Sequence, residues 1–199
     1  MAFNVAIDGP AGAGKSTIAK SVAAELNFIY VDTGAMYRAI ALYLIRNGIS
    51  ADDNAGISEK CKEAKVSIQY VDGKQVVLLN GEDVNPYIRT EEVGNMASAS
   101  STNPDVRAQL LDLQRALAAN NDVIMDGRDI GTNILPNAQV KIYLTASTSM
   151  PISEVSKKTA SSACFKGAIS RFISRSSRSA ISFSISLKSQ SNPLATSSL

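Results

Sequence analysis

A glycine-rich run near the N-terminus constrains this chain more than any other feature. Residues 9–16 read Gly-Pro-Ala-Gly-Ala-Gly-Lys-Ser and fit the pattern G-x-x-x-x-G-K-[ST]. An apolar run, 3–8, precedes it and an amphipathic segment, 16–26, follows it, which predicts a strand, a loop and a helix. Glycines let backbone approach a ligand without a Cβ in the way, and a helix N-terminus attracts anions. The run therefore predicts a site for nucleotide phosphates rather than an empty turn.

Two side chains of this run have roles that follow from their positions. Lys15 can reach the outer phosphates of a nucleotide, and the Ser16 hydroxyl can bind Mg²⁺. The remaining members of the predicted phosphate site are Gly9, Gly12, Ala13, Gly14 and Thr17.

A second motif, Asp-Gly-Arg-Asp at 126–129, directly follows the apolar run 123–125. A carboxylate at the end of a buried strand beside a phosphate loop can hold Mg²⁺, which assigns Asp126 to the metal together with Ser16. Arg128 suits a phosphate, whereas Asp129 suits an exocyclic amine or a sugar hydroxyl of a second substrate. The competing interpretation is a local turn closed by an Arg–Asp ion pair.

Composition excludes several other kinds of chemistry. The 199 residues contain no histidine, which excludes a Ser-His hydrolase and most kinds of zinc site. The net charge of +2 favours neither nucleic acid nor membrane as a partner. Cys61 and Cys164 lack metal-ligand spacing and are expected to be free thiols. No apolar run approaches membrane-spanning length and no signal sequence is recognisable, so a cytoplasmic protein is expected.

Apolar runs and helical patterns alternate along the first three quarters of the chain. Strands are expected over 3–8, 28–31, 123–125 and 140–144, with helices over 16–26, 33–47, 52–64 and 104–118. Two further runs, 66–70 and 75–79, flank Asp72-Gly73 and predict a hairpin. The predicted fold is α/β, a P-loop NTPase-type parallel sheet with helices on both faces and a small antiparallel β insert.

The composition changes near Thr148. Residues 1–148 hold 13 basic and 17 acidic side chains, whereas 149–199 hold 7 basic side chains, one acid and 17 serines. Alternation over 180–187 is typical of a strand, and the rest of this part lacks core-forming periodicity. We interpret 149–199 as a divergent, serine-rich basic tail that is either disordered or the product of a shifted reading frame, with an anion-binding arm as the alternative.

Taken together, these motifs resemble the bacterial cytidylate (CMP) kinase family. The matching stretches, in chain order, are 7–16, 32–38, 80–84, 88–93, 104–107, 125–132 and 141–147. The resemblance covers about residues 1–148. The arginine-rich helix and lid with which the family continues are not recognisable after Thr148, which predicts impaired turnover.

The resemblance implies transfer of the ATP γ-phosphoryl group to CMP or dCMP with Mg²⁺, by a monomer. Lys15 and Asp126 would be the catalytic residues, and the residues from Gly12 to Thr17 would hold the ATP phosphates. The nucleoside monophosphate would be held by Thr33, Arg38, Arg107, Arg128 and Asp129, with Arg89 and Ser98 as further candidates. Two alternatives stay open: a non-catalytic nucleotide-binding remnant, and a P-loop kinase for another small acceptor.

The resemblance also implies a division of the chain. Residues 1–64 and 101–148 would form the P-loop core, 65–100 a nucleoside-monophosphate-binding insert, and 149–199 the tail.

Overall fold

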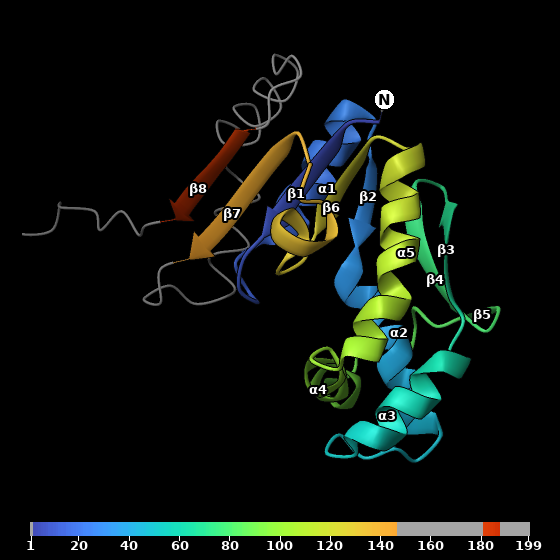
Figure 1. Ribbon diagram of the computed structural model, residues 1–199. Coiled ribbons are helices and arrows are strands. Elements are labelled where there is room, and N and C mark those ends of the chain that lie inside the picture. The colour runs from blue at the N-terminus through green and yellow to red at the C-terminus, as the bar shows by residue number, and fades with distance from the viewer. Residues whose placement is uncertain (1, 147–180, 188–199) are drawn as a thin grey trace, which may run out of the picture.

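A five-stranded parallel sheet forms the centre of the computed structural model, which describes residues 2–146 and 181–187 (Figure 1). The strand order is β2-β6-β1-β7-β8. The strands are β1 Asn4–Asp8, β2 Ile29–Asp32, β6 Val123–Asp126, β7 Val140–Ala146 and β8 Ile181–Leu187. All four neighbouring pairs are parallel, with Val5 opposite Ile124 on one side and Val140 on the other.

Helices cover both faces of this sheet, because successive residues of a strand point to opposite faces and apolar side chains lie on both. On one face Val5 and Ile7 pack with Ile18 and Val22 of α1 (Lys15–Leu26). On the other face Ala6 belongs to a larger core that includes α2 (Thr33–Arg46) and α5 (Pro104–Asn120). The predicted fold class is therefore confirmed.

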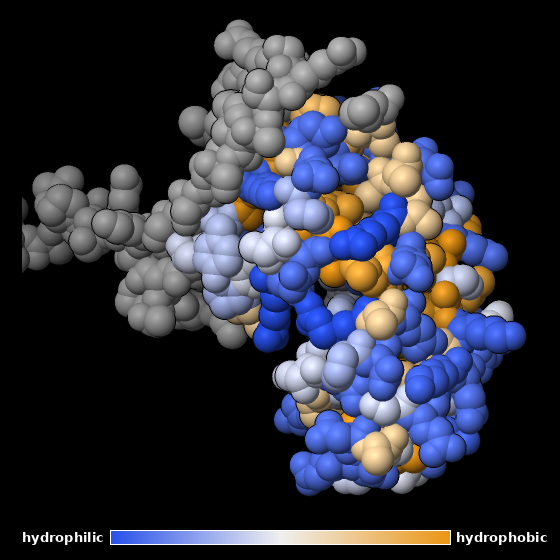
Figure 2. All heavy atoms as spheres, in the orientation of Figure 1, coloured by the Kyte–Doolittle hydropathy of each residue, from blue (hydrophilic) through white to orange (hydrophobic). Residues whose placement is uncertain are grey.

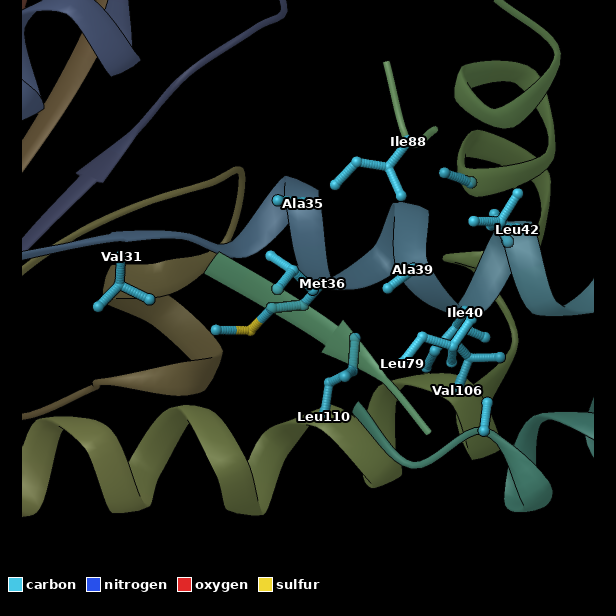
Figure 3. Close-up of a cluster of buried hydrophobic side chains, with 14 of the residues drawn as sticks. Val31, Ala35, Met36, Ala39, Ile40, Leu42, Leu79, Ile88, Val106 and Leu110 are labelled. Atoms are coloured by element: carbon cyan, nitrogen blue, oxygen red, sulfur yellow. The ribbon is translucent and has the colours of Figure 1, made fainter. Parts of the chain in front are cut away.

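The larger core lies between α2, α5 and the small sheet (Figure 3). Met36 and Ile40 of α2 are fully buried there against Leu79 and Leu110. Burying a side chain of this size stabilises the fold by about 1.5–3 kcal/mol. Side-chain caps start the helices around this core: Asp32 caps α2, Thr90 caps α4 (Glu91–Ser100) and Asn103 caps α5.

The small antiparallel sheet has the order β3-β4-β5, formed by Val66–Val71, Lys74–Leu79 and Glu82–Asp83. Both turns use left-handed residue pairs, Asp72-Gly73 (φ 51° and 71°) and Asn80-Gly81 (φ 50° and 87°). Such pairs match the twist of a two-residue hairpin turn, so the hairpin prediction at 72–73 is confirmed.

Two side chains of this hairpin form hydrogen bonds with the backbone of β2 in the main sheet. Gln75 Oε1 accepts from Asp32 N at 2.8 Å, and Gln75 Nε2 donates to the Asp32 carbonyl at 3.2 Å. The Tyr70 hydroxyl donates to the Tyr30 carbonyl at 3.2 Å. Because β2 is an outer strand of the sheet, these side chains occupy backbone groups that a neighbouring strand would otherwise pair. We call Tyr70 and Gln75 the latch.

One local prediction needs correction, and two elements were not predicted. The expected helix over 52–64 is α3 (Asn54–Lys60) followed by a 3₁₀ turn, η1 (Cys61–Glu63). Helix α4 was not predicted, because its centre holds Gly94 and its apolar stripe is short. The short π-helix η2 (Ile130–Ile134) also has no recognisable sequence pattern.

The serine-rich tail is described over one stretch. Strand β8 agrees with the alternation predicted over 180–187 and pairs with β7. The other predictions for 149–199, and that for Cys164, lie outside the described residues; Cys61 is a buried free thiol. None of the helices in the described ranges is long and apolar enough to cross a membrane.

Candidate functional site

The glycine loop joins β1 to α1 in a conformation that its glycines permit. Gly9, Gly12 and Gly14 have φ of 145°, 77° and 79°, which residues with a side chain rarely adopt. A Cβ at Gly9 would overlap the carbonyl oxygen of Leu144 on β7. Gly14 is the N-cap of α1, and no side chain caps this helix end. The first backbone N–H groups of α1 are therefore left for an anion.

Lys15 is the first residue of α1 and turns back over the loop. Its Nζ donates to the Pro10 carbonyl at 2.7 Å. Burial lowers the pKa of Lys15, while the nearby Asp126 acts in the opposite direction. A partly desolvated ammonium interacts strongly with a phosphate because less water screens it.

Asp126 lies at the carboxyl end of β6 and binds two hydroxyl groups. The Ser16 hydroxyl donates to Asp126 Oδ2 at 2.6 Å, and the Tyr30 hydroxyl donates to Oδ1 at 3.1 Å. Burial, aided by the charge of Asp32, raises the pKa of Asp126 to about 6. Burial and the same two acids raise the pKa of Tyr30.

These groups suit Mg²⁺ rather than a softer metal. A carboxylate and a serine hydroxyl are hard oxygen ligands, and Mg²⁺ in nucleotide sites takes one or two protein oxygens and completes its shell with phosphate and water. Among the described residues no group of three or more His, Cys, Asp or Glu side chains could hold a metal on its own. The pair Ser16 and Asp126 therefore fits a metal that arrives with a nucleotide.

The loop after β6 is fixed by a buried carboxylate from β1. Asp8 accepts from the backbone N–H groups of Ile130 and Gly131 at 2.7 and 2.8 Å. The Thr33 hydroxyl donates to the Asp126 carbonyl at 2.8 Å. A Cβ at Gly127 would overlap Ile130 and the Thr33 hydroxyl. Arg128 and Asp129 are thus presented from a loop with little room to move.

Three arginines from other parts of the chain line the same cavity as this loop. Arg107 of α5 forms an ion pair with Asp129, and Arg89 pairs with Asp32 at 2.7 Å. Asp129 also accepts from Asn133 Nδ2 at 3.0 Å. Arg38 lies on α2, where a Cβ at Gly34 would approach its guanidinium within 3.3 Å.

A cavity of about 330 Å³ brings these groups together. Figure 2 shows a hollow bordered by hydrophilic side chains between the sheet and the part that holds α3 and α4. Eleven predicted site residues line the cavity: Gly12, Lys15, Ser16, Thr33, Arg38, Arg89, Ser98, Arg107, Asp126, Arg128 and Asp129. Four predicted phosphate-loop residues do not line it: Gly9, Ala13, Gly14 and Thr17.

Sequence reasoning did not single out Asp8, Tyr30, Asp32 or Gln114 individually. Asp8 and Tyr30 act on residues 122 and 96 positions away in the chain, so no local spacing could identify them. Gln114 lies on the predicted helix 104–118, and a polar residue among its apolar neighbours was the available signal.

Comparisons with known proteins decide the family. The family model described as cytidylate kinase matches residues 5–173. The chain belongs to the cytidylate kinase family. A cytidylate kinase of Caldicellulosiruptor bescii is 53% identical over 144 residues, which is 72% of this chain and 64% of that protein.

Two other relatives named cytidylate kinase are similar to the same extent. That of Geobacillus sp. (strain WCH70) is 48% identical and that of Leuconostoc mesenteroides 52%, each over 145 residues, 73% of this chain and 65% of the relative. The chain thus spans slightly less than two thirds of the length of these cytidylate kinases. The family match reaches residue 173, further along the chain than the motif resemblance to about 148.

Proposed function

We propose that this chain transfers the γ-phosphoryl group of ATP to CMP or dCMP, giving ADP and CDP or dCDP. The observation that carries the proposal is that one cavity is lined both by the phosphate loop and by the arginines around the loop after β6. A phosphoryl donor and a phosphorylated acceptor can then meet in one place. Family membership and the names of the relatives support the same reaction.

Positioning and charge neutralisation account for most of the catalysis of phosphoryl transfer. On this proposal the ATP phosphates bind the phosphate loop through the backbone N–H groups of Gly9, Gly12, Ala13, Gly14, Lys15, Ser16 and Thr17. The Lys15 ammonium stabilises the transferring group. Ser16 and Asp126 would hold Mg²⁺, which when bound neutralises charge on the phosphates. The two hydroxyl donors on Asp126 fix the direction of its carboxylate.

The acceptor would bind on the opposite side of the cavity. Arg38 and Arg128 suit its phosphate, because a guanidinium can bind two phosphate oxygens at once. Asp129, oriented by Arg107, suits the nucleoside. Thr33, Arg89 and Ser98 complete the proposed acceptor site. We assign the insert 65–100 to acceptor binding and expect a cytoplasmic monomer that acts on neither nucleic acid nor membranes.

A coupled assay of CMP-dependent ADP release tests this function. Lys15→Ala should abolish release, whereas Lys62→Ala, an exposed lysine outside the cavity, should leave it unchanged. CMP, dCMP, UMP, AMP and shikimate should be compared as acceptors. Release that depends on UMP, AMP or shikimate but not on CMP or dCMP would contradict the proposed acceptor.

The change of composition after Thr148 favours one second candidate, a nucleotide-binding protein without turnover. Calorimetric titration with ATP and with CMP separates the two. Binding of both ligands without ADP release would support the second candidate.

A further inference from the structure

A second cavity lies beside β2, the outer strand of the main sheet. Its volume is about 830 Å³, compared with about 330 Å³ for the candidate site, and such a volume is typical of small-molecule pockets. Most of its lining comes from the second half of α1, from β2 and from the hairpin β3–β4. The proposed function gives this cavity no role. We call it the edge cavity.

Three aromatic side chains line the edge cavity: Phe28, Tyr30 and Tyr70. Each of them is half-buried, and the aliphatic side chain of Ile29 also lines the cavity. The Lys20 ammonium lies over the ring of Tyr30, 5.3 Å from its centre. Aromatic rings stack on flat ligands, so this lining suits a planar ring better than a flexible chain.

The charged side chains of the edge cavity leave one positive charge in excess. Its lining contains three cations and two carboxylates: Lys20, Lys74, Arg89, Asp32 and Asp72. Arg89 and Asp32 neutralise each other in an ion pair of 2.7 Å. None of the ion pairs among the described residues includes Lys20, Lys74 or Asp72. Two lysines and one carboxylate therefore remain for a ligand, and they match one negative charge.

The ion pair between Arg89 and Asp32 borders both cavities, because both residues line each of them. The Arg89 side chain is 56% exposed, whereas that of Asp32 is 13% exposed. Asp32 Oδ1 is also held as the cap of α2, where it accepts from the Ala35 N–H at 3.0 Å. Arg89 is therefore the partner that can move. An anion in the edge cavity attracts its guanidinium away from the candidate site.

We propose that the edge cavity binds a flat aromatic molecule with one negative charge, and that this ligand opposes binding of the acceptor through Arg89. The binding follows from the edge cavity alone, whereas the coupling rests on the proposed function. One or two fused rings with a carboxylate or sulfonate group have the required chemistry. Because coupling between two sites is reciprocal, each ligand weakens the other by the same factor.

Naphthalene-2-sulfonate is a suitable probe, because it has two fused rings, one charge and no phosphate. Calorimetric titration should show that it binds the wild type, whereas methanesulfonate, which lacks the rings, should not bind. Lys20→Met removes an exposed cation and should weaken binding of the probe about fivefold. Lys62→Met is the matched control: Lys62 is exposed and lines neither cavity, so binding should not change.

A second variant fills the edge cavity instead of changing its charge. Ala24 lines the cavity from an exposed position on α1. Ala24→Phe places a ring where the ligand would lie and should weaken binding of the probe at least about tenfold. Neither Lys20 nor Ala24 lines the candidate site, so both variants should bind CMP as the wild type does in the absence of the probe.

Titration of CMP at rising fixed concentrations of the probe tests the coupling. The affinity for CMP should fall to a limit about fivefold below its starting value, and saturating CMP should lower the affinity for the probe by the same factor. In Arg89→Met the probe should no longer change the affinity for CMP. Coupling that persists in Arg89→Met would overturn the role of this residue, as would an affinity for CMP that the probe leaves unchanged in the wild type.

Three results would overturn the edge cavity as the binding site. They are a wild type that does not bind the probe, equal binding by the wild type, Lys20→Met and Ala24→Phe, and an affinity for CMP that falls without limit as the probe is added. The last result would place the probe in the candidate site itself. Binding of methanesulfonate as tight as that of the probe would overturn the aromatic part of the proposal.

Failure of the proposed function gives a different pattern. A wild-type chain that binds no CMP contradicts the proposed acceptor and the coupling together. The probe titrations with the wild type, Lys20→Met and Ala24→Phe contain no CMP, so they still decide whether the edge cavity binds its ligand.

Discussion

At the scale of single residues, Asp126 shows how a site can lower the stability of the fold that holds it. Its pKa of about 6 lies above the ordinary value of 3.8 in the unfolded chain, because burial disfavours the charged form. Ionisation therefore favours unfolding. The loss of stability caused by this ionisation is complete above pH 6 and disappears as the pH falls below about 4.

Asp126→Asn should therefore stabilise the metal-free protein at pH 7.5. The gain should be on the order of 2–3 kcal/mol, from the difference between the two pKa values, and should vanish near pH 4. The amide oxygen can still accept from one hydroxyl donor. Urea denaturation in EDTA at several pH values measures the effect. A gain that is the same at pH 4 and pH 7.5 would contradict it.

Asp8 has the opposite effect on stability, because its carboxylate satisfies two backbone N–H groups in a buried position. Asp8→Ala should lower the free energy of unfolding by about 2–5 kcal/mol, since bonds to charged groups contribute about 1.5–3 kcal/mol each. Asp122→Ala is the control: Asp122 accepts from the Phe3 N–H at an exposed position, and its loss should cost less than about 1 kcal/mol. Equal losses in urea denaturation would contradict this account.

At the scale of elements, the latch determines how firmly the hairpin β3–β4 is held to the sheet. Gln75→Ala removes both bonds to Asp32 and should raise amide hydrogen exchange in β3 and β4 about tenfold, the effect of about 1.4 kcal/mol. Gln69→Ala, at an exposed position on β3, should not change it. Unchanged exchange in Gln75→Ala would mean that apolar packing alone holds the hairpin.

The elements also show what the sequence can and cannot reveal. Strands β1 and β6 each contain three consecutive apolar residues, and the glycine pairs mark the hairpin turns, so local patterns predict them. The phosphate loop and the motif 126–129 locate one side of the cavity for the same reason. Other contacts join segments that are far apart in the sequence, so no local spacing predicts them. They are the hydrogen bonds from the η2 backbone to Asp8, from Tyr30 to Asp126, and between the latch and β2.

At the scale of the whole molecule, the proposed site combines residues of the sheet with arginines from other parts of the chain. Arginines that stabilise the transition state increase the rate of phosphoryl transfer by a factor of about 10³–10⁵. The motifs that resemble the family end near Thr148 and no arginine-rich lid is predicted after them, although the family match extends to residue 173. From the sequence-based expectation that this lid is missing, we predict CMP-dependent turnover at least about 10³-fold below that of a relative such as the Caldicellulosiruptor bescii cytidylate kinase, with binding of CMP better preserved. Steady-state kinetics of both proteins measures this. Comparable kcat values would contradict it.

The latch has a consequence for the behaviour of the protein in concentrated solution. An outer strand with unpaired backbone groups is a template on which another chain can add its own strand. Gln75 and Tyr70 already occupy the Asp32 N–H, the Asp32 carbonyl and the Tyr30 carbonyl on that border of the sheet. The side chains that hold the hairpin in place therefore also protect β2 from intermolecular strand addition.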